Sequence, residues 1–575
     1  MNSETHNSDA SYLNAVVEKY AGRGRDALLP MLHDVQTLFG WLSRESQEVI
    51  GKTLYVPLAE IHGVIEFYSM FYNRPTPKKV IRLCEDPACH IAGADEVADA
   101  INKVISENNT ASGFENPMII EQVPCLGMCE HAPAGLFGTN PAGSLQADSA
   151  PGYLEGEGPE PMAKVFGQTR LITERIGKVN PLSLDDYRAY GGFEVLRSIL
   201  MKNPEDILNE VEQSGILGRG GAMFPLGRKW RFTRAAFGEA KFVVVNGDES
   251  EPGTFKDRCL MEEDPFAVIE AATIAGYAIG AEKGWIFVRG EYPRAYARLD
   301  HAVKMARKNG YLGRDILNSG FDYDIEMRLG AGAYICGEET ALFSAIEGMR
   351  GFPRIKPPFP VTHGLFNRPT AINNVETLVT VLAALKMGVD SWQTYGTKQS
   401  PGTKLFCVSG HVKQPGLYEL PFGLTVQELI ELAGGVQGGA RIQAVLLGGA
   451  AGTFLGPKEL GLELTYEDAR LKEVPLGSGV IMVFNEKADL RKTLYQLSRF
   501  FAHESCGKCF PCQLGTQRQK EILAGIANGS EKLNSNKRDL IDIGHAMTEM
   551  SLCGLGQTAS SAILSAINIW PELVE

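Results

Sequence analysis

The sequence lacks several features that would each indicate a particular class of protein. No run of about 20 apolar residues occurs, so no transmembrane helix is predicted. Basic residues are outnumbered, with 56 Lys+Arg against 69 Asp+Glu and a formal net charge of −13, which argues against nucleic-acid binding. There is no Walker A sequence and no tandem repeat. The polar start MNSETHNSDA lacks the apolar core of a secretory signal, so a cytoplasmic location is expected.

Length and pattern predict a multidomain α/β and α+β protein. The 575 residues correspond to roughly three to five domains, and 44% hydrophobic residues suffice for their cores. Apolar periodicity, glycine and proline positions then divide the chain. The predicted segments are a helical region (1–75), a small α/β domain with cysteines in two loops (76–140), a Gly/Pro-rich acidic linker (141–180), an α/β domain (181–400), an α+β module (401–488) and a helical region (489–575).

Eight of the eleven cysteines cluster in two sets, and the first set indicates a metal cofactor. Cys84 and Cys89 form C-x4-C, and Cys125 and Cys129 form C-x3-C. Four thiolates from two loops suit a [2Fe–2S] cluster. Zinc and free thiols remain alternatives, although structural zinc pairs more often have C-x2-C spacing.

The second set indicates [4Fe–4S]. Cys506, Cys509 and Cys512 form C-x2-C-x2-C, and Cys553 follows in SLCGLG. Three closely spaced thiolates and one remote thiolate are typical of a cubane cluster and unusual for zinc. The remaining cysteines, Cys259, Cys336 and Cys407, are predicted to be small buried hydrophobes.

Segments between the two cysteine sets suit nucleotide and flavin binding, although each alone is also typical of a plain glycine turn, a solvated acidic turn or a rigid surface loop. The glycine-rich GRGGAMFP (218–225) lets the backbone approach a phosphate or a flat ring, although it is not a G-x-G-x-x-G motif. The acidic NGDESEPGTFKD (246–257) follows a predicted strand, where α/β domains usually bind ligands. Its carboxylates would repel a 2′-phosphate, which favours NAD over NADP. Weaker indications are GAGAYICGEET (330–340), PRIKPPFP (353–360) and INNVET (372–377).

These motifs, in this order, resemble the flavoprotein subunit that admits NADH electrons to respiratory complex I. The N-terminal CEDPAC and CLGMCEHAPAGLF are similar to the [2Fe–2S] subunit of the same enzyme, fused in front. The runs DDYRAYGGFEVL (185–196) and GLFNRPTAINNVET (364–377) look most like the β subunit of a molybdenum- or tungsten-dependent formate dehydrogenase. Similar fused chains are the diaphorase subunits of NAD-reducing hydrogenases.

The resemblance implies the nature of each domain and the residues of each site. It implies an N-terminal helical bundle, a thioredoxin-like [2Fe–2S] domain, a non-Rossmann FMN- and NADH-binding domain, a ubiquitin-like module and a helical bundle holding [4Fe–4S]. The residues implied around FMN are Gly218, Arg219, Gly220, Gly221, Lys229, Asn246, Asp248, Tyr334, Gly337, Glu338, Asn373, Asn374 and Thr377. Those implied at NAD(H) are Phe224 and Phe232, sandwiching adenine, Lys356 at the pyrophosphate, and Glu249, Glu251, Glu339 and Phe359.

The implied activity is hydride exchange between NAD(H) and FMN, with no side chain as acid or base, followed by single-electron transfer through [4Fe–4S] to a partner subunit. The [2Fe–2S] cluster would lie off that route. No ligand set for a pterin, NiFe or H-cluster centre is present, so a second catalytic centre must lie on the partner. A flavin-free iron–sulfur scaffold or redox sensor and a zinc-structured NAD-binding protein are the alternatives. Met223 and Leu226, where the family usually has glycine and often threonine, are departures expected to affect the cleft.

Overall fold

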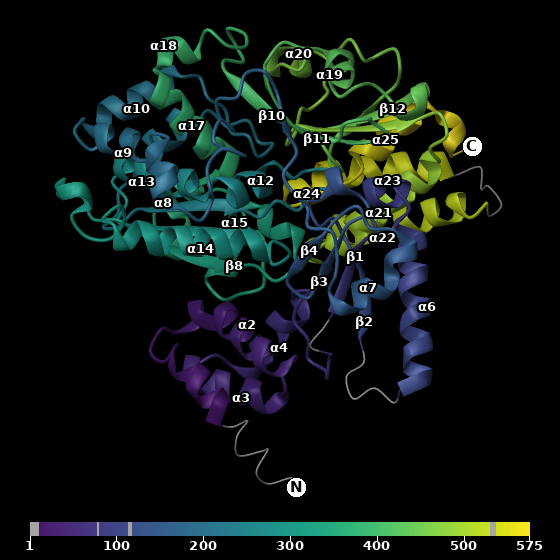
Figure 1. Ribbon diagram of the computed structural model, residues 1–575, viewed down its shortest axis with the longest axis horizontal. Coiled ribbons are helices and arrows are strands. Elements are labelled where there is room, and N and C mark those ends of the chain that lie inside the picture. Colours follow the sequence, from purple (N-terminus) through teal and green to yellow (C-terminus); the bar gives the residue numbers. More distant parts are fainter. Residues whose placement is uncertain (1–10, 78–79, 113–117, 530–535, 575) are drawn as a thin grey trace.

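The computed structural model describes residues 11–77, 80–112, 118–529 and 536–574 (Figure 1). It has the predicted multidomain α/β and α+β architecture, with three separate sheets and many helices. Among the described residues, no helix is both long and apolar enough to cross a membrane. Residues 1–10, on which the expectation of no secretory signal rests, lie outside the described part.

The N-terminal helices form a small bundle on one side of the molecule (Figure 1). They are α2 (Leu28–Phe39), α3 (Arg44–Leu54) and α4 (Leu58–Phe67). Ser43 caps α3 by accepting a hydrogen bond from the amide of Ser46, as expected for a helix N-terminus. The following residues dock on the central domain, where the amides of Ser69 and Met70 donate to the carbonyls of Gly332 and Ala331.

The first cysteine-bearing domain is a four-stranded mixed sheet with helices on it. The strands β1 (Val80–Cys84), β2 (Ile119–Val123), β3 (Gly135–Phe137) and β4 (Asn140–Ala142) are ordered β2-β1-β3-β4. The helices are α5 (Pro87–Ile91), α6 (Ala94–Ser112) and α7 (Ala150–Glu155). Tyr153 of α7 stacks on Phe137, so the core of this domain continues beyond residue 140.

A four-stranded parallel sheet forms the centre of the largest domain. Its order is β8-β7-β6-β9, with β6 (Phe242–Gly247), β7 (Lys283–Val288), β8 (Asp324–Leu329) and β9 (Thr370–Asn374). The inner strands β6 and β7 are continuous apolar runs, as expected for a sheet covered on both faces. Because the strands are parallel, their carboxyl ends meet at one edge.

Helices surround this central sheet. They are α8 (Leu184–Ala189), α9 (Glu194–Ile199), α10 (Pro204–Gln213), α11 (Leu226–Ala235), α12 (Lys256–Glu263), α13 (Pro265–Ile279), α14 (Pro293–Lys308), α15 (Glu339–Ile346), α16 (Pro360–His363), α17 (Val375–Met387) and α18 (Val389–Trp392). The 3₁₀ turn η5 (Tyr334–Gly337) precedes α15.

The next unit, here called the six-stranded module, comprises residues 403–485 together with one strand from the preceding linker. Its sheet order is β13-β12-β14-β10-β11-β5, built from β5 (Val165–Phe166), β10 (Thr403–Gly410), β11 (Gly416–Pro421), β12 (Ile442–Leu447), β13 (Thr453–Leu455) and β14 (Val480–Asn485). Two helices, α19 (Val426–Leu432) and α20 (Tyr466–Leu471), complete it. Thr425 and Glu428 form a capping box that fixes the start of α19.

The C-terminal region is helical, as predicted. It contains α21 (Leu490–Glu504), α22 (Phe510–Ala527), α23 (Asn536–Met550), α24 (Gly554–Thr558) and α25 (Ser561–Ile569). In Figure 1 these helices lie beside the six-stranded module and above the first cysteine-bearing domain.

The segment 141–180, expected as a linker, is anchored to the six-stranded module. The buried carboxylate of Glu419 on β11 accepts hydrogen bonds from the amides of Leu171, Ile172 and Thr173. The hydroxyls of Thr173 and Thr403 add two more. A buried carboxylate with several donors offsets its desolvation, so this contact fixes the path of the segment between two domains.

Candidate flavin, nucleotide and iron–sulfur sites

A cavity of about 580 Å³ lies at the carboxyl ends of the central strands. Strand β6 brings Asn246 to this edge, and β9 brings Asn373 and Asn374 beside it. Apart from Arg219, every residue implied around FMN lines this cavity: Gly218, Gly220, Gly221, Lys229, Asn246, Asp248, Tyr334, Gly337, Glu338, Asn373, Asn374 and Thr377.

The cavity wall has the polar atoms and the smooth surface that a flavin requires. Oδ2 of Asp248 and Nδ2 of Asn373 are buried without a hydrogen-bond partner among the described residues. Buried polar groups are normally paired, so this acceptor and this donor fit a ligand such as an isoalloxazine edge. A Cβ at Gly337 would lie 3.3 Å from the carbonyl oxygen of Asp248, and one at Gly220 would lie 3.2 Å from the Cβ of Asn374. Glycine at these two positions therefore lets the backbone segments that form the cavity wall pack closely together.

Hydrogen bonds between loops hold the polar wall in place. Nζ of Lys229 donates to the carbonyl of Ile372 over 3.0 Å, and burial lowers the pKa of this lysine. Nδ2 of Asn246 donates to the carbonyl of Gly337 over 2.9 Å. These bonds join residues from α11, β6 and η5 to their neighbours, so the cavity has a defined shape.

Arg219 does not point into the cavity. Its guanidinium is buried in the six-stranded module, 4.9 Å from the ring centre of Phe422, and donates to the hydroxyl of Tyr466 over 3.2 Å. Its amide donates to Oγ1 of Thr377 over 2.9 Å. The backbone of Arg219 therefore contacts the cavity-lining residue Thr377, and its side chain ties the glycine loop to the six-stranded module.

Met223, one of the two departures from the family pattern, does not line the cavity. Its φ is +51°, a left-handed conformation that costs a non-glycine residue about 1 kcal/mol. Glycine avoids this cost, which explains the family preference at this position. The Met223 side chain packs against the core of the six-stranded module. Leu226, the second departure, is buried at the start of α11 and does line the cavity.

The residues implied at NAD(H) divide into two groups. Phe224, Glu249, Glu251, Glu339 and Lys356 line the cavity. Phe232 and Phe359 do not line it, and their exposed fractions are 46% and 55%. Phe224, which does line the cavity, is 42% exposed.

Glu249 also has a structural role that its motif does not reveal. Its carboxylate accepts hydrogen bonds from the amides of Asp257 and Arg258 over 2.8 and 2.9 Å, at the start of α12. Burial, followed by the charge of Asp257, raises the pKa of Glu249 to about 8.

Sequence reasoning missed Ala222, Ile335 and Ile372, which lie inside the quoted motifs, and two larger groups of cavity residues. One group follows the acidic loop and comprises Ser250, Thr254, Lys256 and Asp257. The other group comes from the module and the C-terminal helices: Gly448, Ala451, Gly452, Pro475, Gly477, Ser478, Gly554, Leu555 and Thr558. The first group could have been predicted from the motif GTFKD. The second group could not, because its residues reach the cavity only through the packing of the domains.

Lys256 is the buried cation beneath this cavity. Its Nζ lies 2.9 Å from Oδ2 of Asp257 and 3.1 Å from Oε2 of Glu376. Burial lowers its pKa, but the two carboxylates outweigh burial and raise the pKa above the ordinary value. The ammonium is therefore charged, and its charge is balanced by the two carboxylates.

The first four cysteines converge in one buried site. Cys84 ends β1, Cys89 lies on α5, and Cys125 and Cys129 lie in the loop after β2. The sulfurs of Cys125 and Cys129 are 3.4 Å apart, and the amide of Gly127 donates to the Cys125 sulfur. Buried convergent thiolates with an N–H···S bond fit an iron–sulfur cluster.

This cluster loop docks directly on the central domain. Nε of Arg258 donates to the carbonyl of Gly127 over 2.7 Å, and its other nitrogens bond Glu130 and Glu262. A Cβ at Gly127 would overlap the hydroxyl of Tyr292, which donates to the carbonyl of Glu249. The first cysteine site is thus joined to the cavity wall through Tyr292 and Glu249.

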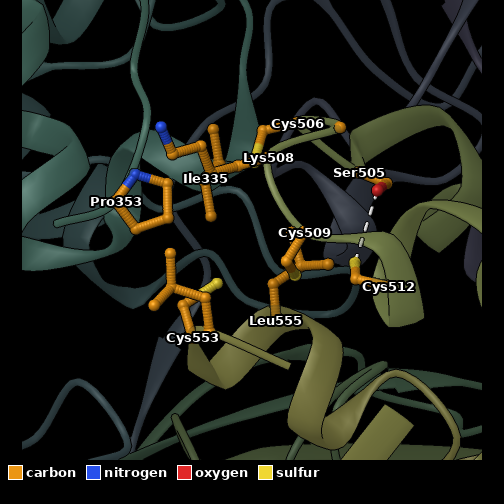
Figure 2. Close-up of a pocket in the computed structure, with 11 residues that line it drawn as sticks. Ile335, Pro353, Ser505, Cys506, Lys508, Cys509, Cys512, Cys553 and Leu555 are labelled. Atoms are coloured by element: carbon orange, nitrogen blue, oxygen red, sulfur yellow. Dashed lines mark hydrogen bonds between the residues drawn. The ribbon is translucent and has the colours of Figure 1, made fainter. Parts of the chain in front are cut away.

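The second four cysteines surround a small cavity between α22 and α24 (Figure 2). Cys509 and Cys553 occupy the N-cap positions of α22 and α24, and Cys512 lies in the first turn of α22. The hydroxyl of Ser505 lies 3.3 Å from the sulfur of Cys512. Four cysteines on one cavity fit the donor set of a [4Fe–4S] cluster.

The flavin-type cavity and the second cysteine site share walls. Ile335 and Leu555 line both cavities, and Figure 2 shows both side chains beside the cysteines. Gly554, which follows Cys553, also lines the larger cavity. Only single side chains therefore separate a ligand in one cavity from a ligand in the other.

Comparison with known protein families matches four separate parts of the chain. A profile of thioredoxin-like [2Fe–2S] ferredoxins matches residues 13–156, and the Nuo51 FMN-binding domain matches residues 211–383. An SLBB domain matches residues 405–451. The iron–sulfur binding region of NADH-ubiquinone oxidoreductase-F matches residues 492–575.

Several characterised proteins are similar over long stretches. An NADH-quinone oxidoreductase subunit of Aquifex aeolicus is 41% identical over 71% of this chain and 95% of its own length. The chain belongs to the family of NADH-oxidising FMN flavoprotein subunits. NAD-reducing hydrogenase HoxS subunit alpha of Cupriavidus necator is 33% identical over 98% of this chain and 94% of its own length. A crystal structure of an NAD⁺-reducing [NiFe]-hydrogenase in the air-oxidised state superposes with a TM-score of 0.83 and 31% identity, covering 96% of this chain and 94% of that chain.

Membership of this family confirms the predicted cofactors, which are FMN, NAD(H), one [2Fe–2S] and one [4Fe–4S] cluster. The thioredoxin-like and SLBB assignments agree with the first cysteine-bearing domain and the six-stranded module. The assignment of individual residues to each cofactor remains a prediction, which the convergence of the side chains supports.

Replacing Cys553 with Ala should remove the [4Fe–4S] signal and leave the [2Fe–2S] signal and the FMN content unchanged. The reason is that Cys553 is the remote fourth donor of one cysteine set and lies outside the other. Low-temperature EPR of the dithionite-reduced chain measures both clusters. Cys407→Ala, at a buried cysteine outside both sets, is the control. Loss of both cluster signals in the Cys553 variant would contradict two independent sites.

Proposed function

We propose that this chain is the NAD(H)-exchanging module of a larger enzyme, passing electrons from the flavin cavity through the second cysteine site to a partner subunit. The observation that carries this proposal is the pair of shared wall residues, Ile335 and Leu555. A one-electron carrier held by the cysteines would adjoin the flavin, which is the arrangement that fast electron transfer requires.

The chain's own part in the reaction is binding and orientation. Bound FMN supplies a hydride acceptor at N5 and releases electrons singly. The glycine wall and the orphan polar atoms of Asp248 and Asn373 orient the ring. No side chain need act as acid or base for hydride transfer, so positioning of the nicotinamide against the ring is the main contribution of the protein.

Lys356 is proposed to bind the pyrophosphate of NAD(H). Its Nζ is 2.9 Å from Oε1 of Glu338 and 2.8 Å from Oε1 of Glu339. Burial acts to lower the pKa of Lys356, but these partners raise it, so the ammonium stays charged.

The first cysteine site is proposed to lie off the main electron route. It adjoins the cavity wall through Tyr292 and Glu249. All four of its cysteines are buried, whereas Cys506, Cys509 and Cys553 of the second site are partly exposed. The second site therefore suits delivery to another subunit, and the first suits storage of an electron.

For the partner, the first candidate is the catalytic subunit of an NAD-dependent formate dehydrogenase, supported by the runs DDYRAYGGFEVL and GLFNRPTAINNVET. The first run also has a structural use. The hydroxyl of Tyr187 and the amide of Phe193 donate to the buried carboxylate of Glu270 on α13. Part of the resemblance of this run to formate dehydrogenase subunits therefore reflects a contact that the fold itself needs.

The second candidate partner is the hydrogenase part of an NAD-reducing hydrogenase. It is favoured by the near full-length match to the Cupriavidus necator subunit, which covers 98% of this chain. Complex I is the third candidate, although the Aquifex aeolicus relative aligns with only 71% of this chain.

Anaerobic titration of the purified chain with NADH tests the proposed function. Flavin absorbance near 450 nm should bleach, and EPR should then show a [4Fe–4S] signal, since electrons pass from the cavity to the adjoining cysteine site. A flavin-containing chain that NADH leaves oxidised would contradict the proposal.

Lys356→Ala should raise the Kd for NADH about tenfold or more, because a charge-assisted hydrogen bond to phosphate is lost. FMN and iron content should not change. Stopped-flow bleaching at several NADH concentrations gives the Kd. Lys458→Ala, on the exposed surface of the six-stranded module, is the matched control. An equal Kd in both variants would remove Lys356 from the nucleotide site.

The partner is identified by purifying the native complex with a tag on this chain. Formate-dependent NAD⁺ reduction together with molybdenum or tungsten is expected for the first candidate. Hydrogen-dependent reduction with nickel would instead establish the second candidate. If the complex shows neither activity, and membranes reduce quinone with NADH, the partner is complex I.

A further inference from the structure

A loop of the six-stranded module, residues 448–452 with the sequence GGAAG, enters the wall of the flavin cavity. The loop follows β12, and Gly448, Ala451 and Gly452 face the cavity together with Glu251 from the acidic loop. The module therefore supplies part of a site that the central domain otherwise builds.

The loop binds the carboxylate of Glu251. The amide of Ala451 donates to Oε1 over 2.6 Å, and the hydroxyl of Tyr334 donates to Oε2. Burial raises the pKa of Glu251 to about 6, while these hydrogen bonds and one from the amide of Ala450 act in the opposite direction. The carboxylate is thus held between η5 of the central domain and backbone amides of the module.

Gly449 packs against the same side chain. A Cβ there would lie 2.5 Å from Cγ and 2.8 Å from Oε1 of Glu251. The φ of Gly449 is +94°, which side chains rarely adopt. The backbone of the loop therefore approaches Glu251 more closely than any residue other than glycine allows.

Two further contacts fix the module relative to the central domain. The buried guanidinium of Arg219 reaches from the glycine loop to Phe422 and Tyr466. The buried carboxylate of Glu376 lies 3.8 Å from Nζ of Lys404 and accepts from the amide of Leu405. Because both contacts are buried, the loop 448–452 has a set position over the cavity.

We infer that the loop 448–452 is a positioning element of the nucleotide site, which holds the Glu251 carboxylate against Tyr334 and so fixes it for contact with NAD(H). This inference rests on the proposed function, because Glu251 is predicted to contact the nucleotide. It assigns to the six-stranded module a part in nucleotide binding in addition to its packing role.

The test compares two glycine substitutions in the full chain loaded with FMN and both clusters. Gly449→Ala places a Cβ against Glu251. Gly438→Ala imposes a similar left-handed backbone, with φ +64°, but nothing lies within 4 Å of its added Cβ. The expected result is an apparent KM for NADH about tenfold higher or more in Gly449→Ala, with FMN content and cluster EPR signals unchanged, and less than about a twofold change in Gly438→Ala. Equal KM values would overturn the inference.

A double-mutant cycle with Glu251→Ala tests whether the effect acts through Glu251. Without that side chain, the added Cβ has lost the neighbour it meets, so Gly449→Ala should not raise the KM further. An equal increase in both backgrounds would contradict the inference.

If Gly449→Ala loses FMN, thermal unfolding gives the same test. The midpoints to compare are those of the unaltered chain, Gly449→Ala, Glu251→Ala and the double variant. Recovery of the midpoint by Glu251→Ala would support the contact, and no recovery would contradict it. Failure of the proposed function can be distinguished from failure of this inference. If the proposed function is wrong, NADH will not bleach the flavin of the unaltered chain.

Discussion

Parallel pairing of β6 with β7 and β9 is the constraint on which the rest of the molecule depends. Since parallel strands end at the same edge, the polar residues after each apolar run are brought together without any further requirement. Asn246 and Asn374 reach one cavity for this reason. The six-stranded module and the C-terminal helices then close that cavity. The first cysteine-bearing domain contacts the outside of the cavity wall, where Gly127 packs against Tyr292 of the central domain.

Buried ion pairs hold the site in place, both within the central domain and between domains. Arg258 of the central domain pairs with Glu130 of the first cysteine-bearing domain and with Glu262 of its own domain. Lys256 pairs with Asp257 and Glu376, all within the central domain. Removing one partner from such a pair typically costs about 3–5 kcal/mol, because the remaining charge stays buried. The Arg258–Glu130 pair therefore favours one arrangement of the first cysteine-bearing domain on the central domain.

The sequence alone was sufficient for those features that depend on local pattern. The apolar runs at 242–245 and 285–288 predicted central strands, and the cysteine spacings predicted two cluster sites. The motifs at 246–257, 330–340 and 372–377 adjoin the ends of central strands, which is where a ligand site was expected, whereas GRGGAMFP and PRIKPPFP lie between helices. The side-chain direction of Arg219 was missed, since it depends on an aromatic pair in another domain. The contribution of Gly448–Gly452 was missed for the same reason, because a short glycine-rich turn has no signal of its own until the module is docked.

The two cysteine sites differ in burial, and this difference has consequences for electron flow. Electron transfer weakens steeply with distance through protein, so a carrier that serves another subunit must approach the surface. The second site meets this condition, with three of its four cysteines partly exposed and the exposed side chains of Lys508 and Phe510 beside them. The first site is enclosed by its own domain and by Arg258 and Tyr292. The proposed delivery role of the second site and the proposed storage role of the first therefore rest on this difference in burial.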